Sequence, residues 1–250
     1  MLLEIAANSL ASAEAAQAGG AGRVELCSAL ELGGLTPSHA QIALTRERLH
    51  IPLYVLIRPR AGDFLYSEAE VEVMLRDIET CVTLGCDGVV LGALDACGSV
   101  DMPRCRALVA AARTLGVTFH RAFDLSRDPV RALEDVAALG CARVLTSGAQ
   151  ASAVDGAALI RDLVRQANGR LAVMPGAGVT AQNIAALSAA TGAREFHASA
   201  KGRLPSGMRH RRPLLDDMQG GELRSDAEQV RALVAALQTP THDIPLPRRV

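Results

Sequence analysis

The sequence contains no tryptophan, and aromatic residues make up only 2% of its 250 residues. This low aromatic content argues against a surface on which unpaired bases stack. Its formal net charge is −1, from 26 basic and 27 acidic residues, so it also lacks the positive field that attracts nucleic acid or an anionic membrane. No stretch approaches the roughly 18 continuous apolar residues of a membrane helix. We therefore expect neither nucleic acid nor a membrane among its partners.

Metal-site and secretion signals are also missing from the sequence. The six cysteines form no C-x-x-C motif, and no histidine pair completes a zinc pattern. The first residues, MLLEIAANSL, have neither a basic start nor a long apolar run, so we expect no signal peptide. These features are typical of a cytoplasmic protein with reduced thiols. Apolar residues make up 49% of the chain, which is enough for a large core.

Short apolar runs alternate with helical patterns along the whole chain. Ser67–Leu84 is the best helical pattern, with a capping box of Ser67 and Glu70 and with Gly85 at its end. Asp128 and Pro129 predict the start of another helix, which Gly140 ends. The predicted strands are Leu2–Ala7, Arg23–Cys27, Leu53–Arg58, Gly88–Leu91, Val117–His120, Arg143–Ser147, Leu171–Met174 and Glu195–Ala198.

A weak internal repeat indicates how these elements combine. The segments GGAGRVEL, LGCDGVVL, LGCARVLT and TGAREFHA each place a glycine at the end of a helix and a strand directly after it. Eight such βα units close a barrel, so we predict an α/β, TIM-type (β/α)8 barrel as a single domain over residues 1–238. A doubly wound open sheet is the alternative, disfavoured because no G-x-G-x-x-G opens the first helix. We expect residues 201–224 to form a long loop and residues 239–250 a flexible, proline-rich tail.

Strand alternation predicts which side chains face the interior of the barrel. A strand that packs apolar side chains against the helices turns every other side chain inward. The inward set predicted in this way is Glu4, Glu25, Cys27, Arg58, His120, Glu195, His197 and Ser199.

The segment GVTFHRAFD, residues 116–124, shows where these groups meet. Its apolar strand ends in His120, Arg121 and Asp124. The C-terminal ends of barrel strands converge at the mouth, where the binding sites of this fold lie. We therefore expect Glu4, Glu25 and Asp124 to pair there with Arg58, Arg121 and a protonated histidine, since an unpaired buried charge is costly. The alternative is that these pairs only fill the end of the barrel.

Glycine- and serine-containing loops follow the last three strands. In many barrels the loops after strands seven and eight hold phosphate with backbone N–H groups and a helix N-terminus. MPGAGVTAQN, residues 174–183, follows the seventh strand, and we expect it to start a helix at Thr180. HASAKG follows the eighth strand and TSGAQ the sixth. The candidate phosphate-binding residues are Ser147, Gly176, Gly178 and Ser199; the alternative is an ordinary tight turn.

Several longer motifs resemble the CutC family, known as copper homeostasis proteins. They are RVELCSALELGGLTPS, IRPRAGDFLYSEAE, DMPR, VTFHRAFD, RVLTSG, MPGAGV and EFHASA, and the resemblance runs from Leu3 to about Leu237. It implies a TIM-type barrel that is cytosolic, forms a homo-oligomer (a dimer or a tetramer) and is associated with copper tolerance or trafficking.

The resemblance also implies a role for Cys27. This residue, in VELC, matches a family cysteine, and copper(I) prefers soft sulfur ligands. Relatives often carry a second cysteine where this chain has Ala6, so a two-thiolate pair across the first two strands cannot form. A copper(I) site at Cys27 would need His120, His197, Met174 or an external thiol.

Three hypotheses for function follow. The first, favoured by the family resemblance, is a copper homeostasis protein that binds copper(I) near Cys27. The second is an enzyme of the proton-transfer, lyase or isomerase type that acts on a small anionic or phosphorylated substrate at the mouth. The third is a non-catalytic barrel that binds partners through its outer helices and tail.

Each candidate residue has a role under the enzyme hypothesis. His120 would carry the proton, oriented by Asp124 or Glu25, and Glu4 and Glu25 would act as bases if burial raises their pKa. The residues expected to bind the substrate are Arg58, Arg121, Ser147, Gly176, Gly178, His197 and Ser199.

Overall fold

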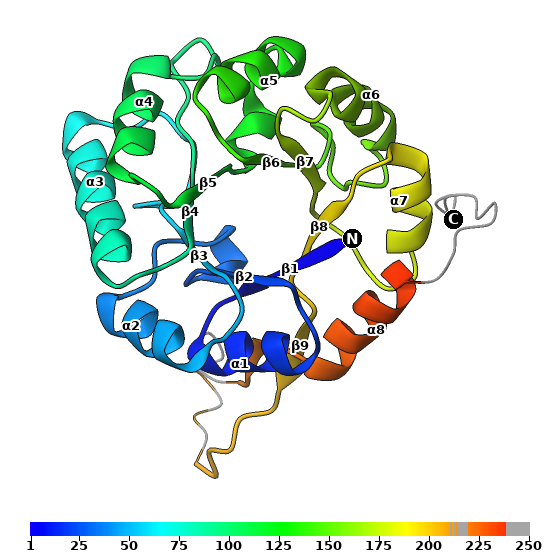
Figure 1. Ribbon diagram of the computed structural model, residues 1–250. Coiled ribbons are helices and arrows are strands. Elements are labelled where there is room, and N and C mark those ends of the chain that lie inside the picture. Colours follow the sequence, from blue (N-terminus) through cyan, green and yellow to red (C-terminus); the bar gives the residue numbers. More distant parts are fainter. Residues whose placement is uncertain (211, 213, 215–219, 239–250) are drawn as a thin grey trace.

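The computed structural model describes residues 1–210, 212, 214 and 220–238, and in it eight parallel strands form a nearly closed barrel (Figure 1). This confirms the predicted TIM-type barrel and excludes the open sheet. The hydrogen-bonded order is β7-β6-β5-β4-β3-β2-β1-β8, and no ladder pair joins β7 and β8 within the described ranges. Every predicted strand is present, with bounds that differ by at most two residues. They are β1 Leu2–Ala7, β2 Arg23–Leu26, β3 Leu53–Leu56, β4 Gly88–Leu91, β5 Gly116–Phe119, β6 Arg143–Thr146, β7 Ala172–Pro175 and β8 Glu195–Ala198.

Helices surround the strands on the outside of the barrel (Figure 1). Apolar side chains from both layers meet between them, and Ile5, Leu26, Phe119 and Phe196 are fully buried there. This burial leaves the alternate side chains of each strand to fill the interior. The helices are α1 Leu10–Ala18, α2 His39–Arg48, α3 Glu68–Thr83, α4 Met102–Ala111, α5 Pro129–Ala138, α6 Ala157–Ala167, α7 Ile184–Thr191 and α8 Ala227–Gln238, with short 3-10 helices η1 Leu30–Leu32 and η2 Arg121–Leu125.

Two helix starts form as the sequence predicts, and one does not. The capping box at α3 is present: Ser67 Oγ accepts the N–H of Glu70, and Glu70 Oε2 accepts the N–H of Ser67. Asp128 caps α5. The predicted helix start at Thr180 is wrong, since α7 begins at Ile184. Asn183 Oδ1 accepts the N–H of Thr180, and this bond holds residues 180–183 as a turn before the helix.

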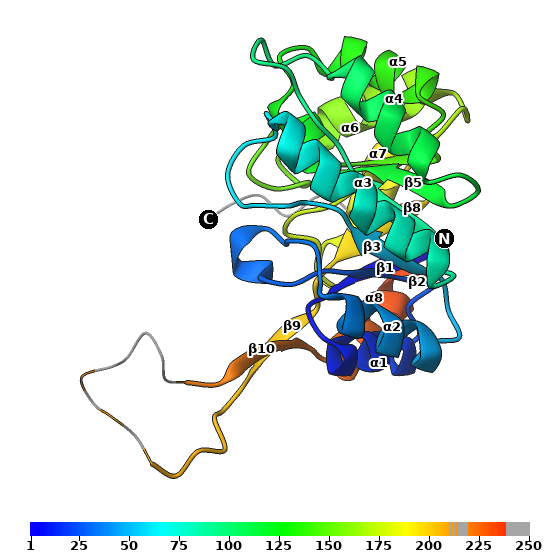
Figure 2. The ribbon, with the colours of Figure 1, turned by 90° about the vertical axis from the view of Figure 1, so that its left-hand side faces the viewer.

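The predicted loop over residues 201–224 contains regular structure instead. Strands β9 (Lys201–Leu204) and β10 (Glu222–Ser225) pair antiparallel and project from the barrel (Figure 2). Side-chain bonds tie β10 to the barrel: Asn8 Nδ2 donates to the carbonyl of Leu223 at 2.8 Å, and Ser225 Oγ donates to the carbonyl of Ala6 at 3.3 Å. The predicted tail, residues 239–250, lies outside the described residues. None of the described helices is long and apolar enough to cross a bilayer.

Candidate functional site

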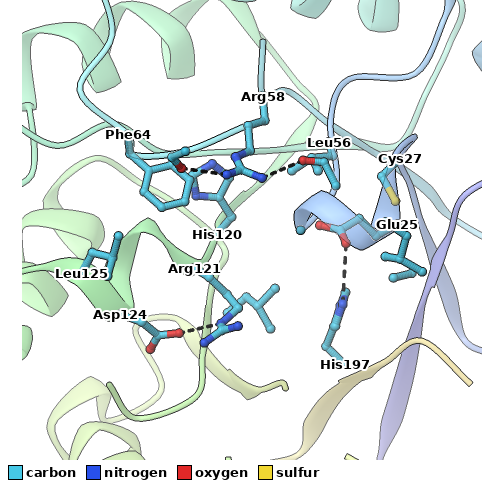
Figure 3. Close-up of a pocket in the computed structure, with 16 residues that line it drawn as sticks. Glu25, Cys27, Leu56, Arg58, Phe64, His120, Arg121, Asp124, Leu125 and His197 are labelled. Atoms are coloured by element: carbon cyan, nitrogen blue, oxygen red, sulfur yellow. Dashed lines mark hydrogen bonds and ion pairs between the residues drawn. The ribbon is translucent and has the colours of Figure 1, made fainter. Parts of the chain in front are cut away.

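A cavity of about 340 Å³ lies at the C-terminal ends of the strands, and we call it the mouth cavity. Polar side chains from β2, β8 and the segments after β2, β3 and β5 line it (Figure 3). The structure therefore brings together residues that lie up to 172 positions apart, as alternation predicts. The charged, imidazole and thiol groups of its wall are Glu25, Cys27, Arg58, His120, Arg121, Asp124 and His197.

His197 lies between two buried carboxylates. Its Nδ1 is 2.8 Å from Glu4 Oε1, and its Nε2 is 3.6 Å from Glu25 Oε2. Burial alone would lower the pKa of His197, but the charge of Glu25 and the hydrogen bond to Glu4 outweigh it and raise the pKa. The ring therefore favours its protonated form, and the expected pairing of carboxylates with a protonated histidine is present.

The two carboxylates have opposite pKa shifts. Burial raises the pKa of Glu25 to about 7, and the nearby charge of Glu4 adds to this, while His197 and Arg23 only partly offset it. Burial would also raise the pKa of Glu4, but the hydrogen bonds and charges of His197 and Arg23 outweigh it and lower the pKa to about 2. Glu25 can thus gain or lose a proton near neutral pH, whereas Glu4 stays ionised.

Glu4 lies below the mouth cavity and does not line it. Arg23 donates from Nε to Glu4 and from Nη2 to Glu195, and Arg143 donates from Nε to Glu195 at 3.0 Å. These arginines were missed by the sequence reasoning. Arg23 lies two residues before Glu25 on the same strand, so alternation places it on the same inner face and would have found it. The network anchors Glu4, so Glu4 acts on the cavity only by holding His197.

Arg58 and His120 meet on another wall of the mouth cavity. Arg58 has no carboxylate partner among the described residues. Instead, its Nη1 and Nη2 donate to the carbonyl oxygens of Leu32, Gly34 and Gly62. Its Nε is buried without a hydrogen-bond partner in the described part of the chain. The expected pairing of Arg58 with a carboxylate is therefore wrong.

His120 has neither the orienting carboxylate nor the proton-carrying role that the sequence predicts. Neither Asp124 nor Glu25 orients it; its Nδ1 accepts the N–H of Ala122 at 3.2 Å. Burial and the charge of Arg58 lower its pKa to about 3, so the ring is neutral and carries its proton on Nε2. That N–H is also buried, with no acceptor among the described residues.

Asp124 is surrounded by donors. Arg121 Nε donates to it at 2.8 Å, and the N–H and hydroxyl of Ser147 donate to it at 3.0 Å. The expected pair with Arg121 is thus present. Ser147 is fully buried and bound in this way, so it positions Asp124 and Arg121 and does not reach the mouth cavity.

A second cavity, of about 710 Å³, lies between the loops that follow β7 and β8, and we call it the loop chamber. Gly178 and Ser199, two predicted phosphate-binding residues, line it. Gly176 lines neither cavity. A Cβ at Gly176 would lie 2.5 Å from Leu145 Cδ1 and 3.3 Å from His197 Cβ, so this glycine allows close packing beside His197.

Cys27 is a poor copper ligand in this environment. It is 1% exposed and packs against Tyr54, Leu56 and Val90. Burial and the charge of Glu25 raise the pKa of its thiol far above the usual value, whereas copper(I) binds the thiolate. Met174 lies elsewhere, with its sulfur accepting from Arg23. Within the described residues, no group of three or more His, Cys, Asp or Glu side chains could hold a metal ion. The residues present do not fit a copper(I) site.

The fold and the site define a class of protein: a TIM-type barrel with a polar cavity at the C-terminal ends of its strands. The sequence profile of the CutC family matches residues 1–202. A CutC family protein from Xanthomonas campestris pv. campestris (strain B100) is 62% identical over 239 residues, which cover 96% of this chain and all of the relative. The mouse copper homeostasis protein cutC homolog is 50% identical over 84% of this chain and 77% of its own length.

Solved structures agree with this placement. A CutC protein from Streptococcus agalactiae superposes with a TM-score of 0.76 at 34% identity, over 79% of this chain and 97% of that one. A thiamine phosphate pyrophosphorylase from Pyrococcus furiosus, at 12% identity and a TM-score of 0.58 over 95% of both chains, shares the fold alone. The chain belongs to the CutC family, as its motifs predict.

Proposed function

We propose that the mouth cavity binds a small anionic molecule and that Glu25 exchanges a proton with it. The observation that carries this proposal is the pKa of Glu25, which burial raises to about 7 in a cavity that also holds Arg58 and Arg121. A group whose pKa lies near the working pH is suited to general acid–base catalysis. The protonated ring of His197 lies beside it and can stabilise negative charge that develops on the substrate.

The cations of the wall support the anionic character of the ligand. Arg58 and Arg121 both line the mouth cavity, and Arg58 has no carboxylate partner among the described residues. The ring of His120 is neutral and its Nε2 is buried away from the open cavity. We therefore give His120 a place in the wall in place of its predicted role as a proton carrier.

Deuterium exchange tests the proton transfer without knowledge of the reaction. A library of small carboxylic, hydroxy and keto acids in D₂O is followed by proton NMR for loss of a C–H signal. We expect at least one compound to exchange with the native protein and Glu25→Gln to lose at least 100-fold of that rate. Glu31→Gln is the matched control, because Glu31 is an exposed carboxylate on η1, outside the cavity wall. Equal rates in native protein and Glu25→Gln would refute the proposal.

Copper(I) binding is the second candidate, and the family name is the observation that favours it. It predicts stoichiometric binding in competition with a copper(I) chelator, lost in Cys27→Ser. Because Cys27 is a buried, protonated thiol with no second thiol in the cavity wall, we expect native protein and Cys27→Ser to compete equally weakly. Strong binding that depends on Cys27 would instead make copper the ligand of this site.

The cytoplasmic setting and the homo-oligomer, a dimer or a tetramer, stay predictions. The six cysteines of the described structure are all free thiols, which supports a reducing compartment. Sedimentation equilibrium measures the number of subunits directly.

A further inference from the structure

The loop chamber has a different chemistry from the mouth cavity that it adjoins. We propose that it binds a phosphoryl group, carried by the same small molecule whose other end reaches Glu25. This inference deepens the proposed function and rests on it for the reacting end of the molecule, but not for the phosphoryl group. It makes the substrate class a phosphate monoester of a small acid or carbonyl compound.

The charges of the chamber wall favour a dianion. Three side chains with basic groups line the chamber, namely Arg121, His197 and Lys201, and no Asp or Glu does among the described residues. The mouth cavity, in contrast, includes Glu25 and Asp124 in its wall. The chamber is therefore the one of these two cavities where a group with two negative charges meets only positive or neutral side chains.

Lys201 is the most distinctive of these groups. It is the only lysine among the 250 residues, so every other Lys or Arg position is an arginine. It begins β9, two residues after Ser199, and it is exposed on the chamber side with no ion-pair partner in the described chain. An ammonium group with three free donors is well suited to phosphate oxygens.

The backbone of the two loops adds neutral donors. The carbonyls of Ala177, Gly178 and Ala200 accept bonds from within the protein, at 3.0 Å from Ala153 N, 2.8 Å from Asn183 Nδ2 and 2.9 Å from Asp226 N. Four backbone N–H groups of these two loops have no acceptor among the described residues. They are the N–H groups of Gly178, Val179, Ser199 and Ala200. With their carbonyls fixed and their N–H groups unpaired, these loops favour an anion over a cation.

The two cavities adjoin each other. Ala6, Leu30, Arg121 and His197 line both of them. A molecule with its phosphoryl group beside Gly178 and Ser199 would pass His197 before it reaches Glu25. Arg121, which Asp124 and Ser147 hold in place, lines both cavities.

The experiment uses the single lysine as its own reporter. The native protein is treated with a trace amine-reactive reagent at increasing concentrations of inorganic phosphate, glycerol 3-phosphate or glycerol, and peptide mass spectrometry follows Lys201. The α-amine of Met1, which precedes β1 at the opposite end of the barrel and is 73% exposed, is the internal reference. We expect both phosphates to slow labelling of Lys201 at least fivefold relative to Met1, glycerol to have no effect, and glycerol 3-phosphate to act at lower concentration than inorganic phosphate.

Variants identify the chamber as the site. In calorimetric titrations with glycerol 3-phosphate we expect Lys201→Met and Ser199→Ala to bind at least tenfold and about threefold more weakly than the native protein. Arg203→Met is the matched control, because Arg203 is exposed on the same strand but outside the chamber wall, and its affinity should be unchanged. Proton transfer is followed separately, by the deuterium exchange of native protein and Glu25→Gln, so loss of proton transfer and loss of phosphate binding are separate results. Labelling of Lys201 that phosphate does not slow, or equal weakening in Lys201→Met and Arg203→Met, would overturn the proposal.

Discussion

Two glutamates that share one histidine have opposite properties in this protein. Glu4 is bound by His197 at 2.8 Å and by Arg23, whereas Glu25 faces His197 across 3.6 Å with no hydrogen bond. Both are buried, so burial alone would raise both pKa values. The difference comes from the donors, which only Glu4 has. Both carboxylates thus favour the charged form of His197, Glu25 through its charge and Glu4 through its hydrogen bond, while Glu25 alone has a pKa near neutral.

Glu25→Gln should change the dependence of stability on pH. The raised pKa means that the folded state holds the Glu25 proton more tightly than the unfolded state, so this group's contribution is full below about pH 4 and is lost as pH rises to about 7. We expect the unfolding free energy of Glu25→Gln, relative to native protein, to improve between pH 5 and pH 8 by on the order of 2 kcal/mol. Urea denaturation at both pH values measures it. Glu31→Gln should show no such change, and parallel pH curves for native protein and Glu25→Gln would contradict the prediction.

Alternation along the strands is sufficient to predict which residues gather but not how they pair. It placed Glu4, Glu25 and His197 on one inner face, and the structure has them in contact. It could not give their depth, since Glu4 lies one level lower, beside Arg23 of the neighbouring strand. It also could not show that a backbone N–H, from Ala122, would bind Nδ1 of His120, or that burial and the charge of Arg58 would keep the ring neutral.

At the scale of the element, helix α3 shows how local signals fix a boundary. Its capping box uses only Ser67 and Glu70, three positions apart, so the sequence contains the whole interaction. The start of α7 is different. Threonine is a common N-cap residue, but Thr180 donates its N–H to Asn183 Oδ1, and the helix begins only at Ile184. Strands β9 and β10 were missed for a related reason. Their pairing joins residues about 20 positions apart, and the side chains that fix β10 to the barrel, such as Asn8, are distant in the sequence.

Ser67→Ala should destabilise the barrel through this cap alone. The substitution removes the acceptor for the N–H of Glu70 and the Ser67 hydroxyl that bonds to the Glu70 carboxylate. The expected loss of unfolding free energy is about 1 kcal/mol, measured by urea denaturation at neutral pH. Ser67→Thr keeps an oxygen in place and should lose less than half of that. If Ser67→Thr is as unstable as Ser67→Ala, the cap is not the cause.

At the scale of the molecule, the junction between β7 and β8 differs from the other junctions between neighbouring strands of the barrel. Strand β8 has ladder hydrogen bonds to β1, and none to β7 within the described residues. Glu195 of β8 compensates for this inside the barrel, because it accepts bonds from Arg23 of β2 and Arg143 of β6. Ion pairs across the interior thus join strands on both sides of the β7–β8 gap.

Glu195→Gln should therefore weaken the barrel at β8. It leaves the guanidinium of Arg143 largely buried with no carboxylate partner, and Arg23 with one partner in place of two. Since Glu195 is partly exposed, we expect a loss of about 2 kcal/mol, less than for a fully buried pair. Hydrogen exchange should quicken for the amides of β8 more than for those of β4. Glu222→Gln, at an exposed pair with Arg224, is the control, and its loss of unfolding free energy should be at most about 0.5 kcal/mol. Uniform exchange across β4 and β8 would contradict the role given to Glu195.

The gap between β7 and β8 also has a consequence for how the family can vary. Because no main-chain ladder crosses it, residues can be inserted at 177–182 or 199–200 without breaking any bond between neighbouring barrel strands. The groups beneath, Glu25 and His197, are anchored by β2 and β8 and would keep their positions. Longer or shorter loops at these places would thus enlarge or shrink the space above Glu25 and His197, and differences in loop length among relatives should follow the size of what they bind.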